Sequence, residues 1–318
     1  MIRYILKRIL QAVPLLLVIS FIVFTLIHLA PYDAIDAQIT SNMSQEEINI
    51  LREQSGLNKP FLIQYVDWLG QILSGNFGHS LVTHNSVGEE ILAKIPNTIS
   101  LVLPAYVTAL VIAIVLGLLA AANKGKWQDK LIDAVASLGI ATPSFWIAMI
   151  FIYVLGYQLN LFPIIGMHTI GKEDDFGDFL SHFIMPYLTL TIVFFAELTR
   201  YVRSSALSQT NEEYVVVQQA FQATKTQIFT RHIIKNVLIP VITQVGMSLP
   251  MLVTGAIITE TVFSWPGIGP YITQATRALD YPIIMAVMLL SATLVIVGNL
   301  ISDILYSIVD PRIRRGGK

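Results

Sequence analysis

The sequence predicts an all-α membrane protein with about six transmembrane helices and both termini in the cytoplasm. Hydrophobic residues make up 54% of the 318 residues and charged residues only 13%, which is too apolar for a soluble domain of this length. Long uncharged runs recur, each close to the roughly 20 residues that a helix needs to cross a bilayer. Lys and Arg are unequally divided between the two faces that these runs define, which sets the orientation.

Six apolar runs are the expected spans: 9–30, 99–122, 131–157, 183–198, 237–258 and 283–301. The first follows Arg3, Lys7 and Arg8, as the apolar core of a signal peptide would. Its apolar length exceeds that of a signal peptide, and no small-residue cleavage site follows it. We therefore expect a retained first span.

The orientation follows from the positive-inside rule. Of the 20 Lys and Arg residues, 15 fall on the face that holds both termini, the 124–130 connection and the 200–235 connection. The opposite, outer face receives Arg52, Lys59, Lys94, Lys172 and Arg277, together with the acidic run at 173–178. Both termini are therefore expected in the cytoplasm. The formal net charge of −1 indicates no nucleic-acid partner.

The first outer connection, residues 31–98, is long enough to be a small helical cap. Ser44 followed by Glu47 forms a capping box that predicts a helix over 44–57, stopped by Gly56. Apolar residues at three- and four-residue spacing predict a second helix over 61–73. This helix is expected to pack on the mouth of the bundle, and alternatively to meet a protein that delivers a substrate.

A polar, helix-forming insertion, EYVVVQQAFQATKTQIFTRHIIKNVLIP, lies on the cytoplasmic side at 213–240. The pattern predicts two short helices joined near Thr224, the second over 225–236, with capping residues for the first at 208–213. Such a segment indicates a docking surface for a soluble partner. The alternative is a connector that merely lies along the membrane interface.

The sequence SWPGIG at 264–269, named here the outer turn, combines helix-breaking residues. Pro266 between Trp265 and Gly267 predicts a tight, rigid turn. We interpret it as a gate or receptor-docking element with Trp265 as an interface anchor, the alternative being plain helix termination. Glu260, just before it, is expected to pair with the loop backbone, or else to act in gating.

Several chemistries are not indicated. The chain has no Cys, and its six His residues make no metal-ligand spacing such as HExxH. No GxxxxGK[ST] phosphate loop is present, so ATP hydrolysis by that route is excluded. We expect a chain that is not an enzyme and binds no metal or cofactor.

Several segments, in order along the chain, resemble permease subunits of bacterial ATP-binding-cassette importers of the dipeptide and oligopeptide family. They are the basic N-terminal span ending at Pro31, LNKPFLIQYVDWLGQILSGNFGHS at 57–80, IPN at 95–97, ATPSFW at 141–146, the 213–240 segment, ETVFSWPGIG at 260–269, DYP at 280–282 and DPRIR at 310–314. The 213–240 segment departs at three positions. Gln222 stands where the family has glycine, and Val216 and Gln219 stand where arginines are usual.

The resemblance implies a type I ABC-importer permease fold in a bacterial inner or plasma membrane. Residues 1–30 would form the first span, 31–98 the cap, and 99–318 the permease core, with a coupling segment at 211–236. It implies four protein partners: a second homologous permease, two ATPase subunits that use the ATP, and an extracytoplasmic peptide-binding protein. The implied ATPase-coupling residues are Tyr214, Val217, Gln218, Ala220, Phe221, Gln222 and Lys225. The implied gate residues are Glu260, Ser264, Trp265, Pro266 and Gly267.

The cargo implied is a dipeptide or oligopeptide, and the alternative is nickel or a metal chelate carried by the same architecture. A self-powered secondary transporter is a third possibility. It would be expected to show an internal repeat and a midmembrane ion site within one chain. No such repeat is evident between the first and second sets of three spans.

Overall fold

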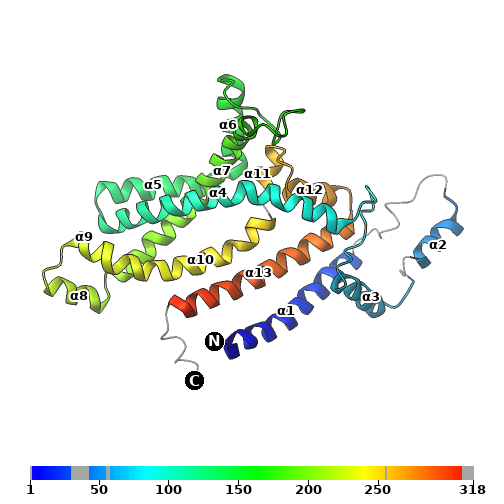
Figure 1. Ribbon diagram of the computed structural model, residues 1–318, viewed down its shortest axis with the longest axis horizontal. Helices are drawn as coiled ribbons and strands as arrows, with labels where there is room; N and C mark the ends of the chain where they lie inside the picture. Colours follow the sequence, from blue (N-terminus) through cyan, green and yellow to red (C-terminus); the bar gives the residue numbers. More distant parts are fainter. Residues whose placement is uncertain (1, 30–42, 55–57, 255, 310–318) are drawn as a thin grey trace.

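The computed structural model describes residues 2–29, 43–54, 58–254 and 256–309, and within these ranges the secondary structure is helical (Figure 1). No β-strand occurs in the described ranges, where one isolated bridge joins His79 and Ser86. The prediction of an all-α fold is confirmed. The expected stop at Gly56 and the DPRIR motif at 310–314 lie outside the described residues.

Long helices lie side by side along the molecule (Figure 1). They are α1 (Ile2–His28), α4 (Val87–Ala122), α7 (Phe176–Gln209), α10 (Ile234–Thr254) and α13 (Tyr281–Val309). Of the described helices, α1, α4, α7 and α13 are long and apolar enough to cross a membrane, and a bent pair would make a fifth span. Helix α10 covers most of the predicted fifth run, so the count of six stays a prediction.

The predicted span over 131–157 is not one continuous helix. Helix α5 (Trp127–Ala141) is followed by α6 (Ser144–Phe151) and the π-helical segment η2 (Ile152–Gln158), and the two halves meet at 96°. The break has a local cause, because Pro143 disfavours a helical conformation at the residue before it. Thr142 is accordingly extended, with ψ 120°. The apolar run looked continuous only because Thr142 and Pro143 add no charge to it.

Two other helices extend well beyond their predicted apolar runs. Helix α4 begins at Val87, so the expected boundary between cap and core at residue 98 falls inside a helix. Helix α7 reaches from Phe176 to Gln209 and not merely over 183–198. Hydropathy finds the part of a helix that lipid surrounds, whereas the backbone continues for several turns outside it.

Three buried clusters follow α4 from one end to the other. The first joins the start of α4 to α12 (Ile268–Arg277) and the start of α13, and the second joins the middle of α4 to α7 and Trp265. The third joins the end of α4 to α7, α10 and the segment between them. Helix α4 therefore contributes to all three clusters and links the two ends of the molecule.

The cap contains α2 (Gln45–Gln54) and α3 (Phe61–Leu73). The capping box is confirmed, since the backbone N–H of Ser44 donates to Glu47 Oε2 at 2.7 Å and the Glu47 N–H donates to Ser44 Oγ at 3.3 Å. The backbone hydrogen bond from Ser44 lowers the pKa of the exposed Glu47 carboxyl group.

Helix α3 packs against α1, as expected. The hydroxyl groups of Tyr65 and Ser20 lie 2.8 Å apart, and the Trp68 ring centroid is 5.4 Å from that of Phe24. Leu62, part of the same predicted stripe, is 63% exposed. The stripe therefore leaves part of its apolar surface uncovered.

Candidate functional site

The segment between α7 and α10 lies at the end of the molecule where α1 begins and α4 and α13 end (Figure 1). It contains α8 (Glu213–Ala220), α9 (Lys225–Ile228) and the π-helical turn η3 (Phe229–Ile233). The prediction that its second helix ends near residue 236 is wrong, because η3 leads directly into α10. Single π-turns are common at functional sites.

The two short helices join where the sequence predicts. The Thr224 side chain accepts from the Gln227 N–H at 3.3 Å, and the Gln227 side chain accepts from the Thr224 N–H at 2.9 Å. This reciprocal capping box starts α9. The capping expected at 208–213 is not found, because Glu212 caps α8 without a side-chain hydrogen bond and Ser208 donates instead to Ser205 O.

Gln222 keeps the backbone geometry that a glycine would adopt. Its φ is +60°, the left-handed region that glycine enters without steric cost. Its N–H donates to Gln219 O at 2.9 Å, and the Ala223 N–H donates to Gln218 O at 3.0 Å. This pair of bonds is a Schellman motif, which ends α8 and turns the chain toward α9.

The segment is anchored on one side and exposed on the other. Val215 is 2% exposed and lies in the third buried cluster with Ile228 and Ile233. In contrast, Phe221 is 79% exposed and Val217 is 49% exposed. Helix α8 thus holds to the bundle by one face and presents apolar side chains on another.

The remaining predicted coupling residues fall into two groups. Ala220, Gln222 and Lys225 are exposed, whereas Tyr214 and Gln218 are half-buried. The Tyr214 hydroxyl group donates to Gln209 Oε1 at 3.0 Å and so ties α8 to the end of α7. Tyr214 therefore fixes the segment to α7, and its hydroxyl group is engaged within the chain.

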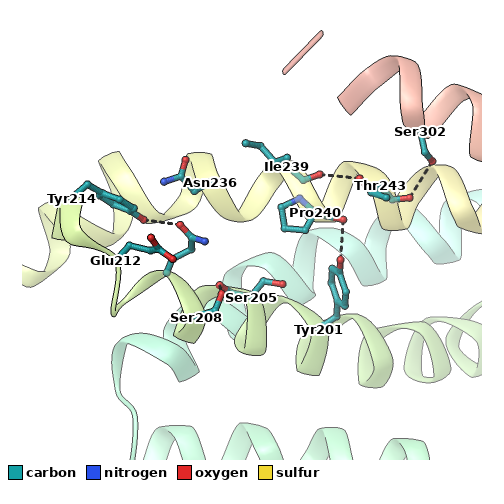
Figure 2. Close-up of a pocket in the computed structure, with 11 residues that line it drawn as sticks. Tyr201, Ser205, Ser208, Glu212, Tyr214, Asn236, Ile239, Pro240, Thr243 and Ser302 are labelled. Atoms are coloured by element: carbon teal, nitrogen blue, oxygen red, sulfur yellow. Dashed lines mark hydrogen bonds between the residues drawn. The ribbon is translucent and has the colours of Figure 1, made fainter. Parts of the chain in front are cut away.

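A polar cavity of about 790 Å³ lies beside Tyr214, between α7 and α10 (Figure 2). The Tyr201 hydroxyl group donates to Pro240 O at 3.1 Å across it, and Ser302 of α13 donates to Thr243 O at 3.1 Å. This cavity was not predicted from the sequence. The signal was present, because Tyr201, Ser205 and Ser208 recur at helical spacing along α7.

A second feature that was not predicted is an ion pair close to this end. Arg203 of α7 donates from Nε to Asp129 Oδ1 at 2.6 Å and from Nη2 to Asp129 Oδ2 at 3.0 Å. The Gly125 N–H donates to the same carboxylate at 2.8 Å. Asp129 is 4% exposed. The pair joins the start of α5 to α7, and residues 74 positions apart gave no sequence signal for it.

At the opposite end, the outer turn connects α11 (Ile257–Val262) to α12, and the predicted tight turn is confirmed. Ser264 is exposed and has a φ of +50°. Trp265 Nε1 donates to Asn97 O at 2.8 Å, and Asn97 Nδ2 donates to Pro266 O at 3.0 Å. The interpretation of Trp265 as an interface anchor is wrong, since its side chain is completely buried among α4 and α7.

Glu260 pairs with the loop backbone, as expected. Its Oε2 accepts from the Gly269 N–H at 2.7 Å, and the side chain is fully buried. Thr98 Oγ1 accepts from the Ile268 N–H at 2.9 Å. A Cβ atom at Gly267 would collide with both Glu260 and Thr98, so the turn requires glycine there for space.

The IPN and SWPGIG motifs, far apart in the sequence, are thus in direct contact. A second such contact joins the end of the 57–80 motif to DYP, because Asp280 accepts from the Ser80 hydroxyl group and from the Leu81 N–H. Asp280 is 1% exposed. Within the described ranges, no group of three or more His, Asp or Glu side chains could hold a metal ion.

The long apolar helices among the described residues are those of a multi-pass membrane protein. Residues 113–315 match the family model of the binding-protein-dependent transport system inner membrane component, and residues 1–102 match the N-terminal model of the same membrane component. The chain belongs to this family, that of permease subunits of ABC importers of the peptide type. Members of the family are pore subunits and are not themselves enzymes.

Curated relatives match over almost the whole chain. The oligopeptide transport system permease protein AppB of Bacillus subtilis is 38% identical, covering 98% of this chain and 99% of its own. The dipeptide transport system permease protein DppB of Alkalihalophilus pseudofirmus is 33% identical, and the match covers 99% of this chain and 100% of DppB. The metal-staphylopine import system permease protein CntB of Staphylococcus aureus is 34% identical over the full length of both chains.

Proposed function

We propose that this chain forms half of the pore of a bacterial importer for dipeptides or oligopeptides. It pairs with a homologous permease in the cell membrane, with both termini in the cytoplasm, and two ATPase subunits dock on the coupling segment. An extracytoplasmic binding protein delivers the peptide. The AppB and DppB names support the peptide cargo, and membership of a binding-protein-dependent family favours this system over a self-powered transporter.

The exposed apolar face of α8 carries the proposal for ATPase docking. Val217 and the C-cap residue Phe221 are exposed on a helix whose other side is fixed by Val215. An aromatic ring exposed beside a hydrophilic loop is suited to a groove on a soluble protein, where burial of a Phe side chain contributes about 2 kcal/mol. We assign Tyr214, Gln218, Ala220, Gln222 and Lys225 to the frame and rim of this contact.

The buried contacts explain how movement of α8 would reach the pore. Val215, Ile228 and Ile233 belong to one cluster with residues of α4, α7 and α10, so displacing the segment displaces those helices. Closely packed interiors transmit such shifts between discrete arrangements. ATP-driven closure of the ATPase pair then favours one arrangement over the other.

Substitution of Phe221 by Asp tests this docking. We expect Phe221→Asp to lose most ATPase co-purification and ATP-dependent uptake while inserting normally. Phe176→Asp is the matched control, since Phe176 is 73% exposed at the far end of α7. Equal ATPase recovery for the two variants would count against the assignment.

For the opposite side, we propose that the cap receives the binding protein and that the outer turn acts as a gate. The turn is bonded to α4 through Asn97 and Thr98, so a shift of α11 and α12 is passed to α4. Glu260, Ser264, Trp265, Pro266 and Gly267 are the residues assigned to it. Removal of residues 44–80 should lower uptake without loss of ATPase subunits, and loss of the assembled complex would instead mean a structural role.

The cargo is tested by uptake into proteoliposomes that hold the complete importer. We expect competition by unlabelled dipeptides and oligopeptides. The similarity to CntB favours a metal chelate as the second candidate. Uptake of a chelated metal that peptides do not inhibit would establish that alternative.

A further inference from the structure

A pocket beside the outer turn carries two cationic side chains. It has a volume of about 320 Å³ and lies between the first turns of α4 and the polar side of α12. Lys94 and Arg277 line it together with Ser264, Thr273 and Gln274, and no carboxylate is among its lining residues. The lining therefore has a net positive charge on a face whose loops are mostly acidic.

Helix α12 builds this pocket through its amphipathic pattern. Ile268, Tyr271 and Ala275 face the first buried cluster. Thr273, Gln274 and Arg277 follow at three- and four-residue spacing on another side of the helix and line the pocket. Burial of the apolar side thus fixes the direction of the polar side.

Lys94 is positioned by an aromatic ring, and neither cation makes a close ion pair among the described side chains. Lys94 Nζ lies 5.1 Å from the centroid of the Tyr271 ring, a cation–π contact that leaves its N–H donors available. Among the described side chains, no ion pair involves Lys94 or Arg277. In contrast, Lys59 on the same predicted face pairs with Asp67 at 2.6 Å.

The neighbouring carboxyl groups are otherwise engaged. Glu90 lies one turn before Lys94 and interacts with the Lys94 charge. Its carboxylate accepts a hydrogen bond from Asn85 Nδ2 at 2.9 Å. Glu260 is fully buried behind the turn, with Oε2 on the Gly269 N–H. Asp280 is bonded to Ser80 and the Leu81 N–H. None of the three is a lining residue of the pocket.

We propose that this pocket binds the carboxylate group of a small organic solute, which on the proposed function is the C-terminal carboxylate of the peptide. Arg277 can hold a carboxylate through two parallel N–H donors, and Lys94 supplies a second charge. Ser264 and Gln274 add neutral donors at the rim. The pocket holds the end of a peptide next to the gate before the peptide passes it.

The experiment measures equilibrium binding of a radiolabelled dipeptide, alanyl-phenylalanine, and of its C-terminal amide. The sample is the complete importer in nanodiscs without the binding protein. Charge-assisted hydrogen bonds predict that the free acid binds roughly tenfold more tightly than the amide. Arg277→Gln and Lys94→Gln should each abolish most of this preference, and Arg277→Lys should retain part of it.

Lys172→Gln is the matched control, because it removes an exposed cation from the predicted outer face outside the pocket. It should keep the preference. Equal binding of acid and amide by the wild-type complex, or a preference unchanged in both Gln variants, overturns the proposal. If inorganic phosphate binds in the pocket and the dipeptide does not compete with it, the proposal is overturned as well, since the site then takes phosphate.

The inference rests on the proposed function for the identity of the solute and for the role of the outer turn as a gate. ATP-dependent peptide uptake, measured with the binding protein present, tests the function separately. Uptake with no acid preference refutes the pocket alone. A carboxylate preference without peptide uptake refutes the peptide function and leaves the pocket assignment standing.

Discussion

The ion pair between Asp129 and Arg203 gives a sharp test of which contacts hold the bundle together. We consider Asp129→Asn, which keeps the size of the side chain and removes its charge. The exposed fractions are 5% for the Asp129 side chain and 25% for that of Arg203. Removing one partner of a buried pair costs about 3–5 kcal/mol. Because Arg203 keeps some access to water, we expect Asp129→Asn to lower the free energy of unfolding by less, about 2 kcal/mol.

The matched control is Asp67→Asn, which breaks the pair between Asp67 and Lys59. This pair is exposed, since the Lys59 side chain is 53% accessible and the Asp67 side chain 47%. Exposed pairs contribute about 0–1 kcal/mol. Thermal unfolding of the purified importer in nanodiscs should therefore show a clear drop in the unfolding temperature for Asp129→Asn, roughly 4 °C, and almost none for Asp67→Asn. The double variant Asp129→Asn/Arg203→Gln should lose less stability than the sum of the losses for Asp129→Asn and Arg203→Gln alone. Equal shifts for Asp129→Asn and Asp67→Asn would refute the argument from burial.

Three further predictions concern turns and caps. Gln222→Gly should stabilise the segment by about 1 kcal/mol, seen as slower hydrogen exchange in α8, because φ +60° strains a residue with a Cβ atom. Gly267→Ala should destabilise the outer turn by about 1–3 kcal/mol through collision with Glu260, lowering the unfolding temperature, whereas Gly70→Ala, with open space around it, should not. The lowered pKa of Glu47 predicts that protection of α2 from hydrogen exchange, corrected for intrinsic rates, is full above the pKa of an unfolded Glu. This protection should be lost as the pH falls through the lower pKa that Glu47 has in the folded protein, and Glu47→Gln should show no such pH dependence. Identical pH profiles for the wild type and Glu47→Gln would contradict the prediction.

Local chemistry predicted several elements well. The helix over 61–73 has the bounds that its apolar spacing predicted, the predicted capping box at Ser44 forms, and two helices join near Thr224 as expected. These features depend on residues three or four positions apart. Neighbouring backbone and side chains are sufficient to specify them.

Features that depend on distant partners were missed or misread. Trp265 was expected at a membrane interface because a Trp beside a turn commonly lies there, but the Asn97 carbonyl group and the aromatic residues of α7 bury it. The cavity of Figure 2 and the Asp129–Arg203 pair likewise need helices that are not adjacent in sequence. The bend at Pro143 has a local signal in the sequence, but the length of the uncharged run predicts a single span across it.

The sequence by itself determined the membrane class, the family and most helix positions, because hydropathy, capping and motifs are written in short stretches of chain. Only the tertiary structure decided how the motifs combine. It joined IPN to the outer turn and Ser80 to Asp280, and it showed which side of α8 is free for a partner. The physical reason is that burial and ion pairing depend on which helices pack together, and that packing minimises the free energy of the whole chain and not of any one segment.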